Sequence, residues 1–195
     1  MARRSDHSRE EIKALAIKHA FALIEEKGEA GFNARNIAKR MGYTVGTIYY
    51  VFGNMENLRF HVCGHILDYF REITIKKLPN AKNKLNYHIS RYIQFSREHF
   101  NLWSFLHSLN NLTKGDAPEF YEEKIHRFFK LLTDALIPYT KTKKTALKAA
   151  RTIVPSLHGM CIYSQRRNLI EQSTSDLEVM AKHMVKTYLK GLNHS

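Results

Sequence analysis

Short polar and aromatic side chains gather on one face of a helix predicted between Thr44 and Phe52. Ile48 and Phe52 lie four residues apart, so they share the face that turns inward. The outward face carries hydroxyl, aromatic and small apolar groups, at Val45, Thr47, Tyr49 and Tyr50. Groups of this size and polarity can reach base edges and phosphates, so the pattern predicts a surface that contacts nucleic acid.

A second short helix precedes this one and is separated from it by a tight turn. Asn33 is a good cap for its start, and Gly42 supplies the left-handed residue that ends it. Thr44 can cap the helix that follows. The apolar face of the first helix comes from Ile37, Ala38 and Met41. Two such helices form a helix-turn-helix, whose second helix enters the major groove of double-stranded DNA.

The composition is that of a globular protein with a sizeable core. The chain has 195 residues, of which 44% are hydrophobic, and its 4 Pro and 9 Gly argue against long flexible linkers. Cys63 and Cys161 have no zinc or redox spacing, which indicates a reduced protein. The first residues are charged and lead into no apolar signal core, and no apolar run could span a membrane. We therefore expect a cytoplasmic protein with no membrane partner.

The net charge of +13 favours a polyanionic partner. Residues 1–60 carry a net charge of +3 and residues 61–195 carry +10, so the basic excess does not lie on the helix-turn-helix. Two interpretations are open: a generally basic surface, which we favour, or an anionic ligand bound by the C-terminal part.

Helical periodicity runs through the whole chain, and no alternating strand pattern occurs. The run Ser8-Arg9-Glu10-Glu11 is a capping box that opens the first helix, which Gly28 and Gly31 stop. The last helix is predicted from Ser175 or Asp176 to Leu189, with Gly191 as its end. Between the helix-turn-helix and that last helix, five more are predicted, to Leu78, over 84–99, over 102–109, over 119–137 and over 143–168. The fold is therefore all-α, with about nine helices.

The helix-turn-helix resembles one family in particular. The residues that carry the resemblance to the tetracycline-repressor (TetR) family are Ile37, Ala38, Gly42, Thr44, Gly46, Thr47, Ile48, Tyr49, Phe52 and Leu58. The resemblance implies an N-terminal three-helix DNA-binding domain over residues 8–66 and a helical ligand-binding and dimerisation domain over residues 67–195. It also implies a homodimer on a partly palindromic operator, released by a small molecule.

The same resemblance assigns DNA contacts by position. Thr47 would meet a base edge or the backbone, and Tyr49 and Tyr50 would meet phosphates or sugars. The full predicted set is Arg35, Asn36, Thr44, Val45, Thr47, Tyr49 and Tyr50. One departure is Met55, where the family usually has a phosphate-binding Lys, so we expect a softer salt dependence. Asn33 replaces the usual Thr as a cap.

Aromatic side chains are abundant in the middle of the chain. Most of them are expected to fill the core, but a pocket between helices is a second use. The residues predicted to line it are Phe95, Trp103, Leu106, His107, Phe128, His158 and Tyr163. Trp103 and His107 lie one turn apart and would share a face, and Pro155 would bend the helix near His158. The effector is unknown; the lining suits an aromatic or hydrophobic molecule, with or without an anionic group.

The resemblance places the dimer interface on the last two helices. The final helix carries an apolar stripe, at Leu177, Met180, Met184 and Tyr188, and the helix before it carries another, at Leu147, Val154, Leu157 and Cys161. Such stripes equally fit packing within one subunit, so both uses are open.

Metal binding and catalysis have little support. His61 and His65 share a helical face, but Cys63 points elsewhere and no third ligand is near. His158 and Cys161 do not form a convincing dyad, and no nucleophile elbow or phosphate loop occurs. We predict no metal, no cofactor and no enzymatic activity.

Two functions remain from these patterns. The first is a sequence-specific transcriptional regulator, in particular a repressor that a ligand releases from its operator. The alternative is a ligand-independent DNA-binding adaptor or nucleoid-type dimer, which a pocket filled by side chains would favour.

Overall fold

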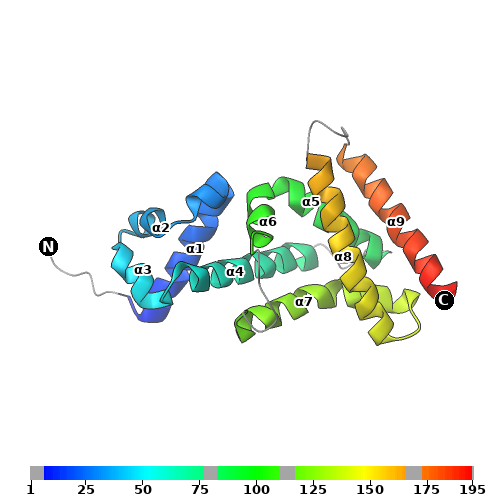
Figure 1. The fold of residues 1–195 in the computed structure, drawn as a ribbon, viewed down its shortest axis with the longest axis horizontal. Helices are drawn as coiled ribbons and strands as arrows, with labels where there is room; N and C mark the ends of the chain where they lie inside the picture. Colours follow the sequence, from blue (N-terminus) through cyan, green and yellow to red (C-terminus); the bar gives the residue numbers. More distant parts are fainter. Residues whose placement is uncertain (1–6, 77–82, 110–116, 166–172, 195) are drawn as a thin grey trace. The chain divides into compact units, whose positions relative to one another are not determined.

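The computed structural model describes residues 7–76, 83–109, 117–165 and 173–194. Across these ranges the chain forms nine α-helices and two short 3₁₀-helices and no strand, which confirms the all-α prediction (Figure 1). The chain divides into two compact units. Unit 1 comprises residues 1–69 and 99–124, and unit 2 comprises residues 70–98 and 125–195. Each unit has its own core.

Unit 1 begins with a compact set of helices. In order, these are α1 (Arg9–Lys27), the 3₁₀-helix η1 (Gly28–Gly31), α2 (Ala34–Met41) and α3 (Val45–Phe52). The predicted capping box is confirmed: the Ser8 hydroxyl accepts the Glu11 amide, and the Glu11 carboxylate accepts the Ser8 amide. This bonding lowers the pKa of Glu11. Contacts join α1 with α2 and α3, so these helices bury a shared core.

Three further segments complete unit 1. They are the first part of α4 (Met55–Lys76), α6 (Phe100–Leu106) and the start of α7 (Glu119–Leu136). Leu58, Val62 and Ile66 on α4 are buried. The Gly28 turn faces the Asn101 side chain of α6, whose amide donates to the Glu25 carbonyl at 2.8 Å. This bond fixes the start of α6 against the end of α1.

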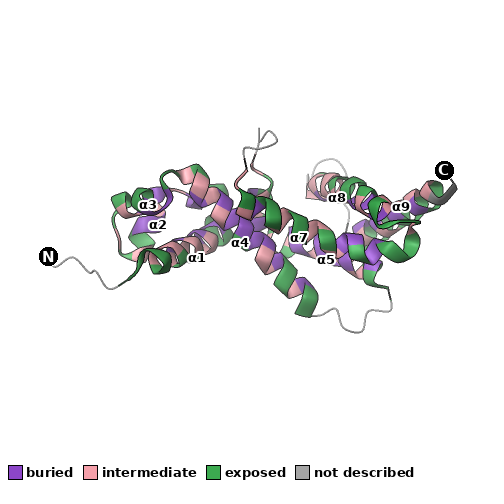
Figure 2. Ribbon diagram, turned by 90° about the horizontal axis from the view of Figure 1, so that it is seen from below, coloured by how far each residue is buried: buried purple, intermediate pink, exposed green. Residues whose placement is uncertain are grey.

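Unit 2 is a helical bundle. It contains α5 (Lys84–Glu98), most of α7, the 3₁₀-helix η2 (Ile137–Tyr139), α8 (Lys143–Gln165) and α9 (Thr174–His194). Helix α9 contacts both α5 and α8. Its buried row, shown by the burial colours of Figure 2, consists of Leu177, Ala181, Val185 and Leu189. A spacing of four residues turns all of them to one side, and their burial attaches α9 to the unit.

Both predicted ends of α9 need correction. The cap is Ser173 rather than Ser175 or Asp176: its hydroxyl accepts the Asp176 amide at 3.1 Å. At the other end, Gly191 does not stop the helix, which continues to His194. A glycine in a helix costs only about 1 kcal/mol, and the buried row continues to Leu189, one turn from the end.

Other observed helix ends differ from the predicted ends by a few residues. Helix α6 begins at Phe100 and ends at Leu106, earlier than the predicted 102–109. Pro155 lies inside α8, as predicted. The ends predicted at Leu78 and at residue 168 lie outside the described residues. Among the described helices, none is long and apolar enough to cross a membrane.

Candidate nucleic-acid interface

The turn between α2 and α3 has two of the three features that its sequence predicts. The Asn33 side chain accepts the Asn36 amide at 2.8 Å, which caps α2. Gly42 has a φ of +72°, a left-handed conformation that glycine adopts without strain. Thr44 occupies the cap position of α3, but its hydroxyl lies 3.1 Å from the Thr47 hydroxyl and bonds no backbone amide. The side-chain cap predicted for Thr44 is therefore not formed.

Helix α3 has one buried and one exposed face. The buried side chains are Ile48, Val51 and Phe52. On the other face, Val45 is 38% exposed, Tyr49 46% and Tyr50 73%. Thr47 is half-buried beside Thr44. Tyr49 and Tyr50 point away from the core of unit 1, so their side chains are accessible to a partner.

Side chains at the start of α1 bond residues before and near the end of α3. The Arg9 guanidinium donates to the Val51 carbonyl at 3.1 Å and lies 5.8 Å from the Tyr50 ring centroid. His7 bonds the Tyr43 hydroxyl at 2.8 Å. The bond to Val51 satisfies a carbonyl in the last turn of α3, and cations are favoured at that end of a helix.

The α2 face carries the remaining predicted contacts. Arg35 is exposed and Asn36 is half-buried. Arg40, one helical turn beyond Asn36, is held by two bonds to Glu26 of α1, at 2.6 and 2.7 Å. Arg35 has no such partner in the described part of unit 1, so its charge is free to meet a phosphate. The basic arm Ala2-Arg3-Arg4 lies outside the described residues.

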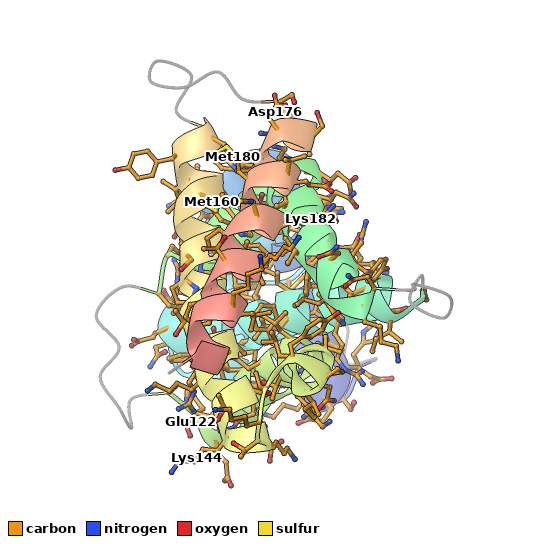
Figure 3. The ribbon with its side chains drawn as sticks, turned by 90° about the vertical axis from the view of Figure 1, so that its right-hand side faces the viewer. Glu122, Lys144, Met160, Asp176, Met180 and Lys182 are labelled. Atoms are coloured by element: carbon orange, nitrogen blue, oxygen red, sulfur yellow. The ribbon has the colours of Figure 1, made fainter. Side chains whose placement is uncertain are left out.

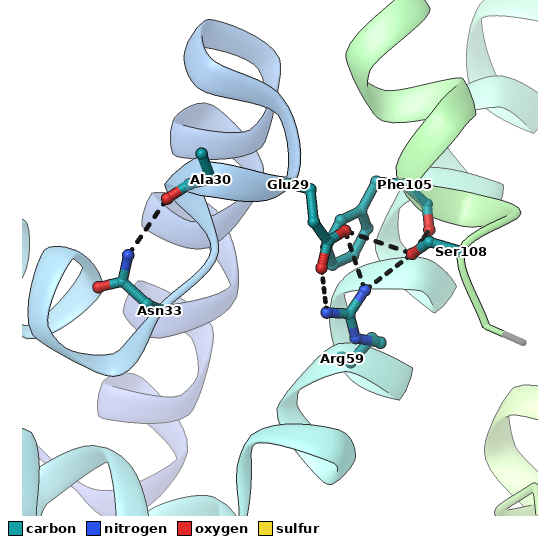
Figure 4. A network of polar contacts seen from close by, with 6 residues as sticks. All are labelled: Glu29, Ala30, Asn33, Arg59, Phe105 and Ser108. Carbon is teal, nitrogen blue, oxygen red and sulfur yellow. Dashed lines mark hydrogen bonds and ion pairs between the residues drawn. The ribbon is translucent and has the colours of Figure 1, made fainter.

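A network of polar contacts centred on Arg59 joins three segments of unit 1 (Figure 4). The Arg59 guanidinium pairs with the Glu29 carboxylate and donates to the Ser108 hydroxyl at 2.8 Å. It also lies between two rings, 4.7 Å from the Phe32 centroid and 4.5 Å from that of Phe105. The network joins η1, α4 and the end of α6. One of its members, Phe32, directly precedes the cap residue Asn33 of α2 in the sequence. Reasoning from the sequence missed it, because its partners are 30 and 49 residues apart.

The predicted ligand-binding residues fall into both units. Trp103, Leu106 and His107 lie on or just after α6 in unit 1, and the rings of Trp103 and His107 are in contact at 5.2 Å, as their spacing predicts. The others belong to unit 2: Phe95, Phe128, His158 and Tyr163. The structure therefore groups them as two sets, and their role as ligand contacts stays a prediction.

Within unit 2, three of these side chains surround one aromatic cluster. Phe95 and Phe128 both contact Phe70, with ring centroids at 5.0 and 5.6 Å. Tyr92 also contacts Phe70, and its hydroxyl lies 3.3 Å from His158 Nδ1. Burial lowers the pKa of His158, which favours the neutral ring. Tyr163 is 59% exposed on α8.

The two predicted apolar stripes on α8 and α9 are partly buried. On α9, Leu177 is buried, Met184 and Tyr188 are half-buried and Met180 is 45% exposed, next to Val179 at 67%. On α8, Leu157 and Cys161 are buried and Leu147 and Val154 are half-buried. Figure 3 shows Met160 of α8 and Met180 of α9 on neighbouring helices. The buried members pack within the subunit.

The histidine pair on α4 has aromatic partners. His61 stacks on Phe120 at 4.2 Å with the planes 8° apart, and His65 meets the edge of Phe21 at 5.2 Å. Burial, with smaller effects of Lys13 and Lys124, lowers the pKa of His61 to about 4. Burial raises the pKa of Cys63 to about 12, so its thiol stays protonated. In the described ranges no group of three or more His, Cys, Asp or Glu could hold a metal ion.

The fold and the α2–α3 geometry define a helix-turn-helix DNA-binding protein. The family described as "Bacterial regulatory proteins, tetR family" matches residues 16–62, and that described as "Tetracyclin repressor-like, C-terminal domain" matches residues 88–188. The second match alone covers more than half of the chain. The chain therefore belongs to the TetR family of DNA-binding transcriptional regulators, and its family and fold are those of regulators rather than enzymes.

Individual proteins are similar to this chain in sequence or in fold. An HTH-type transcriptional regulator of Staphylococcus aureus (strain MRSA252) is 27% identical over 155 residues, which cover 77% of this chain and 80% of the relative. A TetR transcriptional regulator from Rhodococcus sp. RHA1 has a TM-score of 0.66 at 19% identity, covering 93% and 98% of the two chains. FadR from Bacillus subtilis, in complex with stearoyl-CoA, has a TM-score of 0.66 at 18% identity, covering 91% and 98%.

Proposed function

We propose that this regulator is a homodimeric repressor that leaves a palindromic operator when a small molecule binds unit 2. The observation that carries the proposal is the division of α3, with Ile48, Val51 and Phe52 fixed in the core and the tyrosines exposed opposite them. Such a helix can insert its exposed face into a major groove without disturbing the fold. Because the proposed partner is DNA, we expect the protein to act in the cytoplasm.

The predicted DNA contacts divide into those that recognise base edges and those that position the protein on the DNA backbone. Val45 and Thr47, near the start of α3, are the proposed contacts to base edges, because the first residues of a recognition helix reach deepest. Tyr49 and Tyr50 are proposed to meet phosphates and sugars. The α2 residues Arg35 and Asn36 and the cap residue Thr44 would set the register on the backbone.

Dimerisation through α8 and α9 completes the proposal. Exposed apolar side chains on these helices, Val179, Met180 and Tyr163, would be removed from water by a second copy. A two-fold dimer would present two copies of α3 to half-sites about 34–36 Å apart. Two proteins of similar fold, FadR in complex with stearoyl-CoA and the multidrug binding protein EbrR complexed with imidazole, support control by a small molecule. A ligand shifts the equilibrium only by binding the two states with different affinity.

The test is binding to the DNA that flanks the protein's own gene, measured by fluorescence anisotropy across a salt series with unrelated competitor DNA. We expect tight, competitor-resistant binding. Thr47→Ala should weaken it about 5- to 100-fold, the effect of losing one base contact, and Tyr49→Phe should weaken it less. Thr152→Ala is the matched control, because Thr152 is an exposed helical threonine of unit 2.

A second outcome would favour the alternative function. Weak, steeply salt-dependent binding that ignores sequence, and that Thr47→Ala leaves unchanged, is the behaviour of a nucleoid-type protein. The basic excess of residues 61–195 is the observation that keeps this alternative open.

A further inference from the structure

A groove between α7 and α8 in unit 2 contains none of the residues predicted from the sequence to bind a ligand. It encloses about 740 Å³, within the range of small-molecule sites. Its apolar lining comes from Ile125 and Phe129 of α7 and Leu147 of α8. The Thr133 hydroxyl donates to the Phe129 carbonyl at 2.9 Å, so this polar group is satisfied within α7.

Cations surround this apolar floor. Lys130 pairs with Asp134 one turn along α7, which neutralises both. The α8 side of the groove contributes three more cations, Lys143, Lys144 and Arg151, and none of these three has a carboxylate partner in the described part of unit 2. The groove therefore has an excess of positive charge beside an apolar surface, and His126 also lines it.

The position of two of these lysines is unfavourable for the helix itself. Lys143 and Lys144 stand in the first turn of α8, which carries no acidic residue. Positive charge is disfavoured there, because the helix dipole is already positive at its N-terminus. The Thr142 hydroxyl accepts the Thr145 amide at 3.1 Å, so the cap supplies no negative charge either. Figure 3 shows the Lys144 side chain pointing away from the ribbon toward solvent. A bound anion would offset this repulsion.

We propose that the α7–α8 groove binds a soluble anionic amphiphile, a molecule with an apolar chain or ring and a phosphate or carboxylate head. The apolar part would lie on Phe129 and Leu147, and the head would bond Lys144 and Arg151. Charge complementarity favours this occupant over a neutral hydrophobic molecule, and the apolar floor favours it over a bare anion. The proposal that the groove binds this ligand does not depend on the proposed function. Only an effect of the bound ligand on operator affinity rests on that function.

Isothermal titration calorimetry on the full chain, without DNA, tests the groove directly. The probe is dodecyl phosphate below its micelle concentration, compared with dodecyl maltoside, inorganic phosphate and a poly-glutamate peptide. We expect dodecyl phosphate to bind at least about tenfold more tightly than each of the others. The double variant Lys144→Gln with Arg151→Gln should lose about tenfold or more in affinity, which corresponds to one charge-assisted bond.

The matched control is Lys186→Gln with Lys190→Gln, which removes the same charge from exposed positions of α9. An affinity within about twofold of the unchanged chain supports the groove. An equal loss in both double variants would overturn the proposal, since binding would then follow net charge. Equal binding of the maltoside or of inorganic phosphate would overturn it as well, and tighter binding of the peptide would assign the groove to an acidic protein. Dodecyl phosphate binding that leaves operator affinity unchanged would support the groove and count against ligand release.

Discussion

The two units place their arginine and lysine side chains differently. In unit 1, Arg40 and Arg59 are held by carboxylates, and Arg9 by a carbonyl, so cations there position the helices around α3. In unit 2, the cations of the α7–α8 groove remain without carboxylates, apart from Lys130. The paired cations of unit 1 hold the helices around α3 in place. The unpaired cations of the α7–α8 groove are available to bind an anion. The comparison shows that the larger basic excess belongs to the unit that does not carry the helix-turn-helix.

The largest expected effect is a loss of unfolding free energy, and it tests whether the two units unfold independently. Ile48→Ala removes a buried side chain from unit 1 and should lower the free energy of unfolding by about 2–4 kcal/mol. Trp103 is the chain's single tryptophan and lies buried in unit 1, so its fluorescence in a urea titration reports that unit.

The matched change in unit 2 is Ile153→Ala, which is equally buried. It should shift the helical signal measured by circular dichroism more than it shifts the Trp103 transition. Equal shifts of the Trp103 transition by both variants would show one cooperative unit and would break the comparison.

The sequence predicts well what local chemistry decides. Asn33, Gly42 and the Ser8 capping box act within four residues, and all three behave as expected. The all-α class follows from periodicity. The contacts of Arg59 are not local, because Glu29 and Ser108 lie 30 and 49 residues away in the sequence. No rule of sequence spacing could have predicted these pairs. The helix end predicted at Gly191 is wrong, because burial of a neighbouring turn outweighs the small helical cost of glycine.

Acidification should affect unit 1 through His61. Its pKa of about 4 in the folded chain lies below the ordinary value of 6.5, so below pH 6.5 the unfolded chain binds the extra proton. The free energy of unfolding should therefore fall as the pH drops from about 7 to 4. We expect a loss of about 1–2 kcal/mol from this group, because solvent screens a half-exposed ring.

His61→Phe keeps a ring against Phe120 and removes the titrating group. Urea titrations at pH 7 and pH 5, followed by Trp103, should show a smaller pH effect in this variant. Burial, with smaller effects of Arg40 and Lys18, also lowers the pKa of His19 in unit 1. Parallel losses in the variant and the unchanged chain would assign the effect to His19 instead.

The smallest effect contrasts one glycine from each unit. Gly42→Ala puts a side chain at a φ of +72° with nothing within 4 Å, so strain alone should cost about 1 kcal/mol. Gly191→Ala lies inside α9 in open space and should stabilise the chain by about 0.5 kcal/mol. Thermal unfolding by circular dichroism measures both, and a loss of stability in Gly191→Ala would contradict the helix end at His194.

The division of α3 has a consequence for how such proteins diversify. The residues that hold the helix in place, Ile48, Val51 and Phe52, are different from those that face outward, so exchange of Val45, Tyr49 or Tyr50 leaves the core intact. A duplicated gene could thus acquire a new target site through a few substitutions without first losing its fold. For protein engineering, a library randomised at these outward positions should consist mainly of folded members, and selection could act on target preference alone.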